Sequence, residues 1–478
     1  MPGTEVDVVV IGMGPGGEDV GARLARAGLE VVGVDGRLVG GECPYYACVP
    51  TKAMIRATDA LQEARRVPGL AGAADVTPDW SLVATRIRDE ITDNWNDQAA
   101  VDRFQEAGGT FVRGWGRLTA PREVTVARPD GTEEVITARR GVVLNTGTEP
   151  AVPPIDGLAE TPYWTNRDAV TVEAVPASLV VLGGGPVGCE LAQVFSRFGA
   201  AVTIVQHADR LVPADEPEAG ELLATAFRDE GITVRTGLSA ARVSYETGQF
   251  HVKLDNGEVI AADRMLVAVG RRTDMKALGI GAVGLDDTAR GVTVDERMRA
   301  TDGLWAIGDI TGHGAFTHMS MYQARIAAAD ILAAANLPGS DDARGTDDAR
   351  GTDEVETADY RATPRVTFTD PEVGSVGLSE AAARAQGLNV RTGVAQLPTD
   401  TTRGFIHKVG NQGFIKVVED ADRGVLVGAT SAGPNGGEVL GALVVAVHAE
   451  VPTKLLRQMI YAYPTFHRGI ETALANLK

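Results

Sequence analysis

Cysteine is scarce in this chain of 478 residues, which contains only Cys43, Cys48 and Cys189. Three cysteines are far too few for the disulfide framework of a small secreted protein. Two cysteines that lie close together in a reducing compartment indicate redox chemistry or metal binding instead. A zinc site would need further cysteine or histidine ligands near Cys43 and Cys48, and the sequence has none there, so we expect no metal site.

Long apolar runs and positive charge are lacking as well. No uninterrupted apolar run approaches the ~18 residues that span a bilayer. Residues 1–7 are acidic, whereas a signal peptide begins with a basic segment. The net charge of -19 disfavours nucleic acid and anionic membranes as partners, because both carry negative charge. We therefore expect a cytoplasmic protein that binds neither.

One arrangement, a strand followed by a glycine-rich turn and a helix, occurs twice in the chain. The apolar runs at residues 8–11 and 179–182 suit strands that are buried on both faces of a parallel sheet. We expect an α/β fold with two Rossmann-like dinucleotide-binding domains and a C-terminal α+β domain. The expected C-terminal strands are residues 365–368 and 413–418, and the expected helices are 438–450 and 454–461.

The first glycine-rich turn has the spacing GxGxxG, formed by Gly12, Gly14 and Gly17. These glycines allow a tight turn and let a pyrophosphate approach the backbone at the start of a helix. The next apolar run, residues 31–34, ends in Asp35, whose carboxylate can bind a ribose diol. A strand, a helix and an acid in this register predict dinucleotide binding.

The second glycine-rich turn repeats the spacing at Gly183, Gly185 and Gly188. Gln206 and Asp35 each lie 18 positions after the last glycine of their turns. An amide does not repel a 2′-phosphate, and His207 and Arg210 can supply positive charge, so the pattern favours NADPH, or use of both nicotinamides, over strict NADH use. The alternative is that Gln206 faces solvent. Two such domains suggest a tightly bound flavin in one and a diffusible nicotinamide in the other.

Cys43 and Cys48 are five positions apart, which is not the spacing of neighbours on a helix. Joining their sulfurs would require the start of a helix to distort, and a strained disulfide is easier to reduce than a structural one. A helix N-terminus also favours the thiolate form. The alternative is a pair of buried, inert cysteines.

Further motifs resemble the pyridine nucleotide-disulfide oxidoreductase family, which includes dihydrolipoamide dehydrogenase, glutathione reductase and mercuric reductase. The Cys-x4-Cys segment, between Gly40-Gly41 and Val49-Pro50-Thr51-Lys52, is similar to the family's disulfide motif. The resemblance implies an enzyme that binds FAD, takes electrons from NADPH or NADH, forms a homodimer and reduces a small-molecule electron acceptor. Other segments that resemble family elements, in the family's order, are residues 145–150, 268–271, 304–309 and 368–373.

The resemblance also implies roles for matched residues. Cys48 would be the thiolate beside the flavin, and Cys43 the exposed thiol that attacks the substrate. Lys52 and Glu190 match an ion pair near flavin N5, although the alternatives are a surface lysine and an acid that complements a helix dipole. Further cofactor contacts are implied at Thr146, Gly147, Gly270, Arg271 and Asp309.

Motif order and composition together predict the domain boundaries. A polar hexapeptide occurs twice in succession within residues 341–352, and we expect a solvated loop there. The predicted domains are an FAD-binding domain at residues 1–155 and 276–338, an NAD(P)-binding domain at 156–275, a linker at 339–356 and a dimerisation domain at 357–478.

The C-terminal segment departs from the family pattern of His-Pro-Thr followed shortly by Glu, in which the His is an acid–base catalyst supplied by the partner subunit. Tyr463 takes the position of the His and Arg468 that of the Glu. A phenol is a poor base at neutral pH, which disfavours efficient exchange with lipoamide or glutathione. His467 and Glu471 can form a displaced pair or an ordinary surface pair. No cysteine follows Cys189, which argues against mercuric reductase activity.

Three functions therefore stay open. The first is an NAD(P)H-dependent flavoenzyme that passes electrons through Cys43 and Cys48 to a small disulfide or related acceptor. The second is a quinone or dye reductase in which the cysteines only modulate the flavin, and the departure at Tyr463 favours it. The third is a redox-sensing flavoprotein without catalysis, which the intact nicotinamide unit disfavours.

Overall fold

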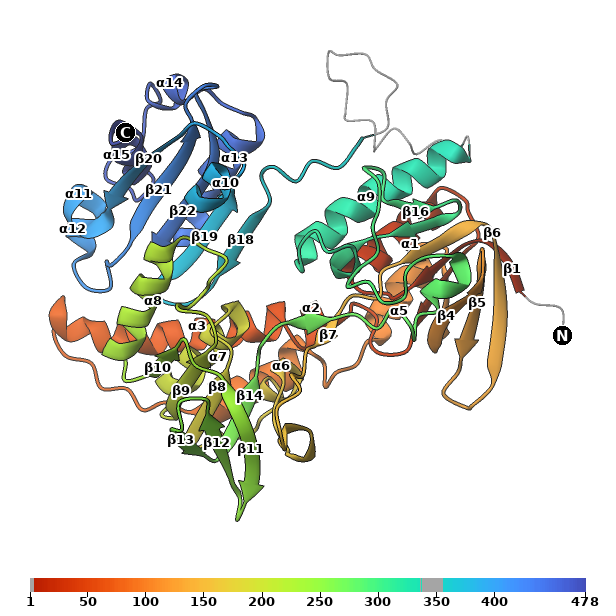
Figure 1. The fold of residues 1–478 in the computed structure, drawn as a ribbon, viewed down its shortest axis with the longest axis horizontal. Helices are drawn as coiled ribbons and strands as arrows, with labels where there is room; N and C mark the ends of the chain where they lie inside the picture. Colours follow the sequence, from red (N-terminus) through yellow and green to blue (C-terminus); the bar gives the residue numbers. More distant parts are fainter. Residues whose placement is uncertain (1–3, 336, 338–355) are drawn as a thin grey trace. The chain divides into compact units, whose positions relative to one another are not determined.

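The computed structural model describes residues 4–335, 337 and 356–478, and the chain divides into two compact units (Figure 1). The repeated hexapeptide at 341–352 and most of the predicted linker lie outside the described residues. No helix in the described part is long and apolar enough to cross a membrane. The first unit comprises Met1–Pro50, Arg88–Glu149 and Arg271–Asp359, and the second comprises Thr51–Ile87, Pro150–Gly270 and Tyr360–Lys478.

The first unit is built on an eight-stranded sheet in the order β16-β17-β6-β1-β2-β3, to which β5 and β4 are joined through β6. Strand β1 pairs in parallel with both β2 and β6, and its residues Val8, Val9 and Val10 are completely buried. A strand that is covered on both faces carries apolar residues without alternation, and this run has that pattern. The strands are β1 (Thr4–Ile11), β2 (Val31–Asp35), β3 (Thr110–Arg113), β4 (Trp115–Ala120), β5 (Glu123–Ala127), β6 (Glu133–Leu144), β16 (Arg299–Thr301) and β17 (Leu304–Ala306).

Helices α1 and α9 pack closely together beside this sheet (Figure 1). A Cβ on Gly16 of α1 would lie 2.1 Å from the Ser320 hydroxyl of α9, so the contact requires glycine. Ser320 in turn donates a hydrogen bond of 2.9 Å to Asn145 Oδ1, at the end of β6. The first glycine-rich turn is thereby fixed between a strand end and two helices. The helices of this unit include α1 (Pro15–Arg26), α2 (Glu42–Tyr45), α5 (Gln98–Glu106) and α9 (Thr317–Ala334).

The second unit repeats the strand–turn–helix opening in a parallel sheet of order β10-β9-β8-β14. A three-stranded antiparallel sheet, β11-β12-β13, packs its buried side chains into the same core, as Phe250 and Val252 show. The elements are α3 (Cys48–Arg66), α4 (Trp80–Thr85), α6 (Asn166–Ala169), β8 (Ser178–Leu182), α7 (Pro186–Arg197), β9 (Ala201–Gln206), α8 (Pro217–Asp229), β10 (Thr233–Thr236), β11 (Ala240–Glu246), β12 (Gln249–Leu254), β13 (Val259–Ala262) and β14 (Arg264–Val267).

The C-terminal part of the second unit, blue in Figure 1, is a five-stranded antiparallel sheet of order β18-β19-β22-β21-β20. Leu443 of α13 and Ile470 of α15 share one buried cluster with Val417 of β21, so both helices cover the same face. The elements are β18 (Pro364–Thr367), β19 (Glu372–Gly377), α10 (Glu380–Ala385), β20 (Val390–Gln396), α11 (Leu397–Asp400), α12 (Thr402–His407), β21 (Phe414–Asp420), β22 (Val425–Gly433), α13 (Gly436–His448), α14 (Thr453–Leu456) and α15 (Arg468–Ala475).

The predicted fold class is confirmed, but the helix expected at 454–461 is wrong beyond Leu456. The Tyr461 hydroxyl donates a hydrogen bond of 3.0 Å to the Leu456 carbonyl, which in a longer helix would accept from residue 460. Met459 and Ile460, in the part of the segment that is not helical, are both exposed, Ile460 to 99%.

Gly17→Ala should destabilise the protein and reduce its flavin content. The added Cβ would lie 2.0 Å from the Gly12 carbonyl oxygen, and such overpacking costs about 1–3 kcal/mol. Urea unfolding and the ratio of flavin to protein measure the effect. Gly441→Ala is the matched control, because this helical glycine faces open space. Equal stability of the two variants would contradict the packing described for the turn.

Candidate active site

The first glycine-rich turn has the geometry of a dinucleotide cradle. Gly12 has a φ of +92°, and a Cβ there would lie 2.3 Å from the Asn145 carbonyl oxygen. Gly14 begins α1, and within the described residues no side chain caps this helix start. The Met13 amide donates a hydrogen bond of 2.7 Å to Asp35, and burial raises the pKa of the Asp35 carboxyl. A glycine-rich turn at a helix start that no side chain caps fits the pyrophosphate of FAD.

The second turn is built in the same way with an amide in place of the acid. Gly184 N donates a hydrogen bond of 2.9 Å to Gln206 Oε1, and the Gln206 side chain is buried rather than facing solvent. His207 is exposed, and its Nδ1 lies 2.8 Å from Ser239 Oγ. Arg210 donates to the Pro213 carbonyl at 3.0 Å. The side chain that accepts a hydrogen bond from the turn is therefore the acid Asp35 at the first turn and the neutral amide Gln206 at the second.

Cys43 and Cys48 lie on two successive helices instead of one. Cys43 is in the single turn of α2, and Cys48 is the first residue of α3. The chain leaves helical geometry between them, with φ of -135° at Tyr46. Cys48 Sγ lies 3.4 Å from the hydroxyl of Thr317, the first residue of α9. Two helices thus begin at this sulfur, where their positive dipole ends favour a thiolate.

Arg271 and Asp309, two residues that are predicted to contact a cofactor, lie in one polar cluster of the first unit. The Thr148 hydroxyl donates a hydrogen bond of 2.7 Å to Asp309 Oδ2. Arg271 donates to the Thr148 carbonyl at 2.6 Å and lies 3.8 Å from the carboxylate of Glu42, the residue before Cys43. Gly147 and Gly270 both have positive φ, at +63° and +131°, so these two predicted positions require glycine.

Lys52 and Glu190, 138 positions apart in the sequence, form an ion pair of 2.7 Å between Nζ and Oε2. Glu190 is only 3% exposed, and its second oxygen accepts a hydrogen bond of 2.8 Å from the Phe368 amide. The Lys52 ammonium also lies 4.8 Å from the centre of the Phe368 ring. A buried carboxylate needs such partners, so Glu190 is not merely a complement to a helix dipole.

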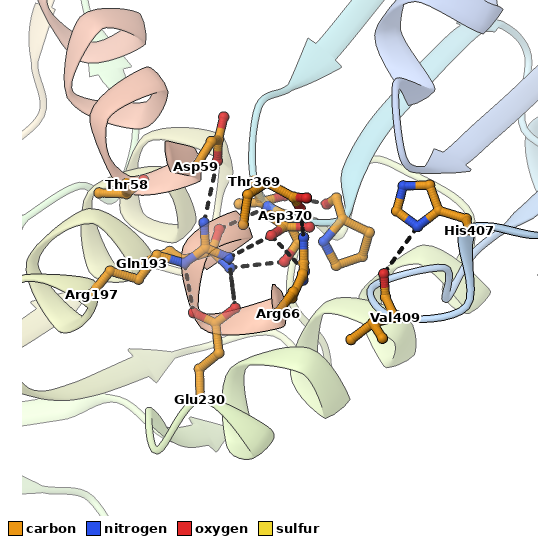
Figure 2. A network of polar contacts seen from close by, with 12 residues as sticks. Thr58, Asp59, Arg66, Gln193, Arg197, Glu230, Thr369, Asp370, His407 and Val409 are labelled. Carbon is orange, nitrogen blue, oxygen red and sulfur yellow. Dashed lines mark hydrogen bonds and ion pairs between the residues drawn. The ribbon is translucent and has the colours of Figure 1, made fainter. Parts of the chain in front are cut away.

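A second ionic network joins α3, α7 and the segment before β19, the same three segments that Lys52, Glu190 and Phe368 connect (Figure 2). The buried guanidinium of Arg197 forms ion pairs with Glu230 and Asp370 at 2.7 Å and with Asp59 at 3.2 Å. Arg66 reaches Asp370 at 2.8 Å. Helices α3 and α7 are thereby tied to the segment before β19. Sequence reasoning missed these residues, although Asp370 lies within the motif at 368–373 that it did identify.

The C-terminal departure from the family pattern is locally ordered. Tyr463 is 65% exposed, and its hydroxyl donates a hydrogen bond of 3.3 Å to Thr402 Oγ1. The Arg468 guanidinium lies 5.4 Å from the Tyr463 ring centre and 3.2 Å from the Glu471 carboxylate. Glu471 therefore pairs with Arg468, while His467 is exposed just before α15.

Cys189 plays no visible part in this chemistry. It is completely buried, burial raises the pKa of its thiol, and its sulfur donates to the Gly184 carbonyl at 3.4 Å. Across residues 4–335, 337 and 356–478, no group of three His, Cys, Asp or Glu side chains is placed to hold a metal ion.

Comparison with known proteins identifies the family. Residues 6–328 match the pyridine nucleotide-disulphide oxidoreductase family, and residues 363–474 match its dimerisation domain. The chain belongs to this family. It is 32% identical to mercuric reductase of Acidithiobacillus ferrooxidans, over 98% of this chain and 82% of that one. It is also 31% identical to dihydrolipoyl dehydrogenase of Thermus scotoductus, over 98% of this chain and 96% of that one.

Solved structures agree on the fold. The HOCl-induced flavoprotein disulfide reductase RclA from Escherichia coli superposes with a TM-score of 0.82 at 23% identity, over 99% of both chains. LpdA from Mycobacterium tuberculosis gives 0.83 at 24% identity, over 99% of both. The family consists of FAD-dependent enzymes that use NAD(P)H, so the chain is an oxidoreductase of this type. Its dimerisation domain, with the exposed Ile460, supports a homodimer.

Asp59→Asn should stabilise the protein at pH 8 but not below pH 4. Burial raises the pKa of Asp59 to about 6 although Arg197 opposes the shift, so the folded state binds its proton more tightly than the unfolded state. Stability from this group therefore falls as pH rises from about 4 to about 6. Because the side chain is 42% exposed, we discount the effect to about 1 kcal/mol.

Urea midpoints of Asp59→Asn and wild type across this pH range measure the difference. Asp229→Asn, at an exposed acid, is the control for the loss of one carboxylate. A variant that is less stable than wild type at pH 8 would show that the Asp59–Arg197 pair is net stabilising, against this account.

Proposed function

We propose that this protein is an FAD-dependent NAD(P)H:disulfide oxidoreductase that passes electrons through Cys43 and Cys48 to a small disulfide or a related acceptor. One observation carries the proposal most directly. Cys48 Sγ lies where α3 and α9 begin, 3.4 Å from Thr317 Oγ1. A sulfur held there is stabilised as a thiolate, which is the reactive form in disulfide exchange.

The cysteines divide the exchange between them. Cys43, on the separate turn α2, attacks one sulfur of the acceptor and releases the other as a thiolate that takes up a proton. The Cys48 thiolate then attacks Cys43 and releases the second thiol, which restores the Cys43–Cys48 disulfide. Two electrons and two protons thereby reduce one disulfide to two thiols. Bound FAD would supply the chemistry that returns electrons from NAD(P)H to this pair.

Lys52 would provide the positive charge that a reduced flavin requires, and Glu190 would hold that ammonium in position. The proposed FAD contacts of the first unit are the Gly12–Gly17 turn, Asp35, the segment at Thr146 and Gly147, and Asp309. The predicted domain boundaries and the cytoplasmic location stay predictions.

NADPH is the proposed electron donor, with NADH also accepted. The Gln206 amide leaves no negative charge beside the second glycine-rich turn, and exposed His207 lies next to it. A carboxylate at this place would repel a 2′-phosphate. Gly183, Gly185 and Gly188 would let the nicotinamide dinucleotide reach the start of α7.

Reduction of a quinone is the second candidate function, and Tyr463 favours it. Thiol–disulfide exchange needs a general acid–base group that transfers protons to and from the acceptor. The phenol at this position is a poor base. Transfer of electrons directly from flavin to a quinone has no such need.

Cys43→Ser separates the two functions. If electrons leave through the cysteines, this variant loses turnover with small disulfides and keeps turnover with quinones, because only the attacking sulfur is missing. Anaerobic titration of the wild-type holoenzyme with NADPH should give the long-wavelength absorbance band of a thiolate beside oxidised flavin. Cys48→Ser should abolish that band. A wild-type enzyme that reduces quinones but no disulfide, at the same rate as Cys43→Ser, would overturn the disulfide function.

Gln206→Glu should raise the KM for NADPH by about tenfold or more and leave the KM for NADH nearly unchanged, since about 1.4 kcal/mol of repulsion is a factor of ten. The new carboxylate can still accept the Gly184 hydrogen bond, so the turn is preserved. Steady-state kinetics with one quinone acceptor and both nicotinamides measure the ratio. An unchanged ratio would contradict the proposed site of the 2′-phosphate.

A further inference from the structure

We propose that the electron acceptor carries an anionic group, a carboxylate or a phosphate, and that a polar hollow beside Tyr463 binds it. The inference rests on the proposed function only in that Tyr463 marks the place of the acceptor. The hollow lies entirely in the second unit and has a volume of about 60 Å³. Its wall includes Thr402, Arg403, Tyr463, Thr465, Arg468 and Thr472.

The size of the hollow suits a small charged group. A cavity needs about 10–15 Å³ for each water molecule that it holds. The hollow therefore holds roughly four waters, or a group of a few heavy atoms. The wall is mainly hydroxyl and guanidinium groups, which are hydrogen-bond donors. A carboxylate or phosphate fits both the volume and the donors.

Two guanidinium groups line the hollow, and each lies over an aromatic ring. Arg403 lies 5.6 Å from the Phe466 ring centre, and Arg468 lies 5.4 Å from that of Tyr463. Stacking of this kind fixes the plane of a guanidinium while its N–H edge stays available. Within the described residues Arg403 makes no ion pair, whereas Arg468 is paired with Glu471. Arg403 is therefore the charge that an incoming anion would meet.

Asp400 is the acidic residue of the wall, and both of its carboxylate oxygens accept hydrogen bonds from neighbouring groups. Asp400 Oδ2 accepts a hydrogen bond of 2.8 Å from the Gln396 amide, and Oδ1 accepts one of 3.0 Å from the Thr399 hydroxyl. Thr402 contributes a further donor, because its oxygen accepts from Tyr463 while its own hydrogen stays available. Tyr463, Thr402 and the bound anion would then form one chain of hydrogen bonds.

The chain as a whole carries a net charge of -19. An acidic protein repels anions in general, so Arg403, an arginine without an ion-pair partner among the described residues, acts as a local entry point for an anion. The exposed apolar side chains of Phe405 and Ile406 adjoin Arg403 in sequence and would seat the uncharged part of such an acceptor.

The test compares three disulfides that share a small reactive core and differ in charge: 3,3′-dithiodipropionate, bis(2-hydroxyethyl) disulfide and cystamine. The wild-type holoenzyme should reduce the anionic compound with the highest kcat/KM and the cationic one with the lowest. Arg403→Gln should raise the KM for the anionic compound about tenfold, the loss expected for one charged hydrogen bond, and leave the neutral compound unchanged. Arg403→Lys should retain part of the preference, since it keeps the charge.

Arg228→Gln, at an exposed arginine on α8, is the control and should leave all three disulfides unaffected. Equal kcat/KM for the three compounds, or an anion preference that survives in Arg403→Gln, would overturn the anion site while leaving disulfide reduction intact. If no disulfide is reduced, the proposed function fails instead. The anion site is then judged with 1,4-naphthoquinone and its 2-sulfonate, where loss of the sulfonate preference in Arg403→Gln supports it and an unchanged preference refutes it.

Discussion

The placement of one sulfur atom at the beginning of two helices is the constraint on which the proposed chemistry depends. Cys48 is the first residue of α3, and its sulfur lies 3.4 Å from Thr317, the first residue of α9. A thiolate there receives the free amides and positive dipole ends of both helices. Further along α3, the ion pairs of Lys52 with Glu190 and of Arg66 with Asp370 tie this helix to other segments of the second unit.

The two glycine-rich turns have the same backbone arrangement but differ in one side chain that contacts the turn. In each, a side chain at the end of the second strand accepts a hydrogen bond from an amide of the turn, Asp35 from Met13 and Gln206 from Gly184. The geometry is the same and the charge of the side chain differs, and in the proposed function this difference sets the preference between a ribose and a phosphorylated ribose.

The sequence predicted the features that depend on local geometry. Both glycine-rich turns and the strands before them follow from spacing alone. The spacing of Cys43 and Cys48 predicted a distorted helix start, whereas the structure places the two residues on separate helices. The Arg197–Asp370 network could not be predicted, because it joins segments 173 positions apart and no local pattern marks an arginine as buried. The helix expected at 454–461 failed for a related reason: the sequence pattern cannot tell an apolar side chain that packs inside from one, such as Ile460, that is exposed.

The acidity of the Cys48 thiol tests the account's central claim most directly. In the Cys43→Ser holoenzyme, the long-wavelength absorbance of the thiolate beside oxidised flavin can be followed as pH is varied. The account predicts a midpoint below that of an ordinary cysteine, as for thiols at helix starts, and a higher midpoint in Thr317→Val. A midpoint at or above about 8.5, the value of an ordinary cysteine, would contradict it.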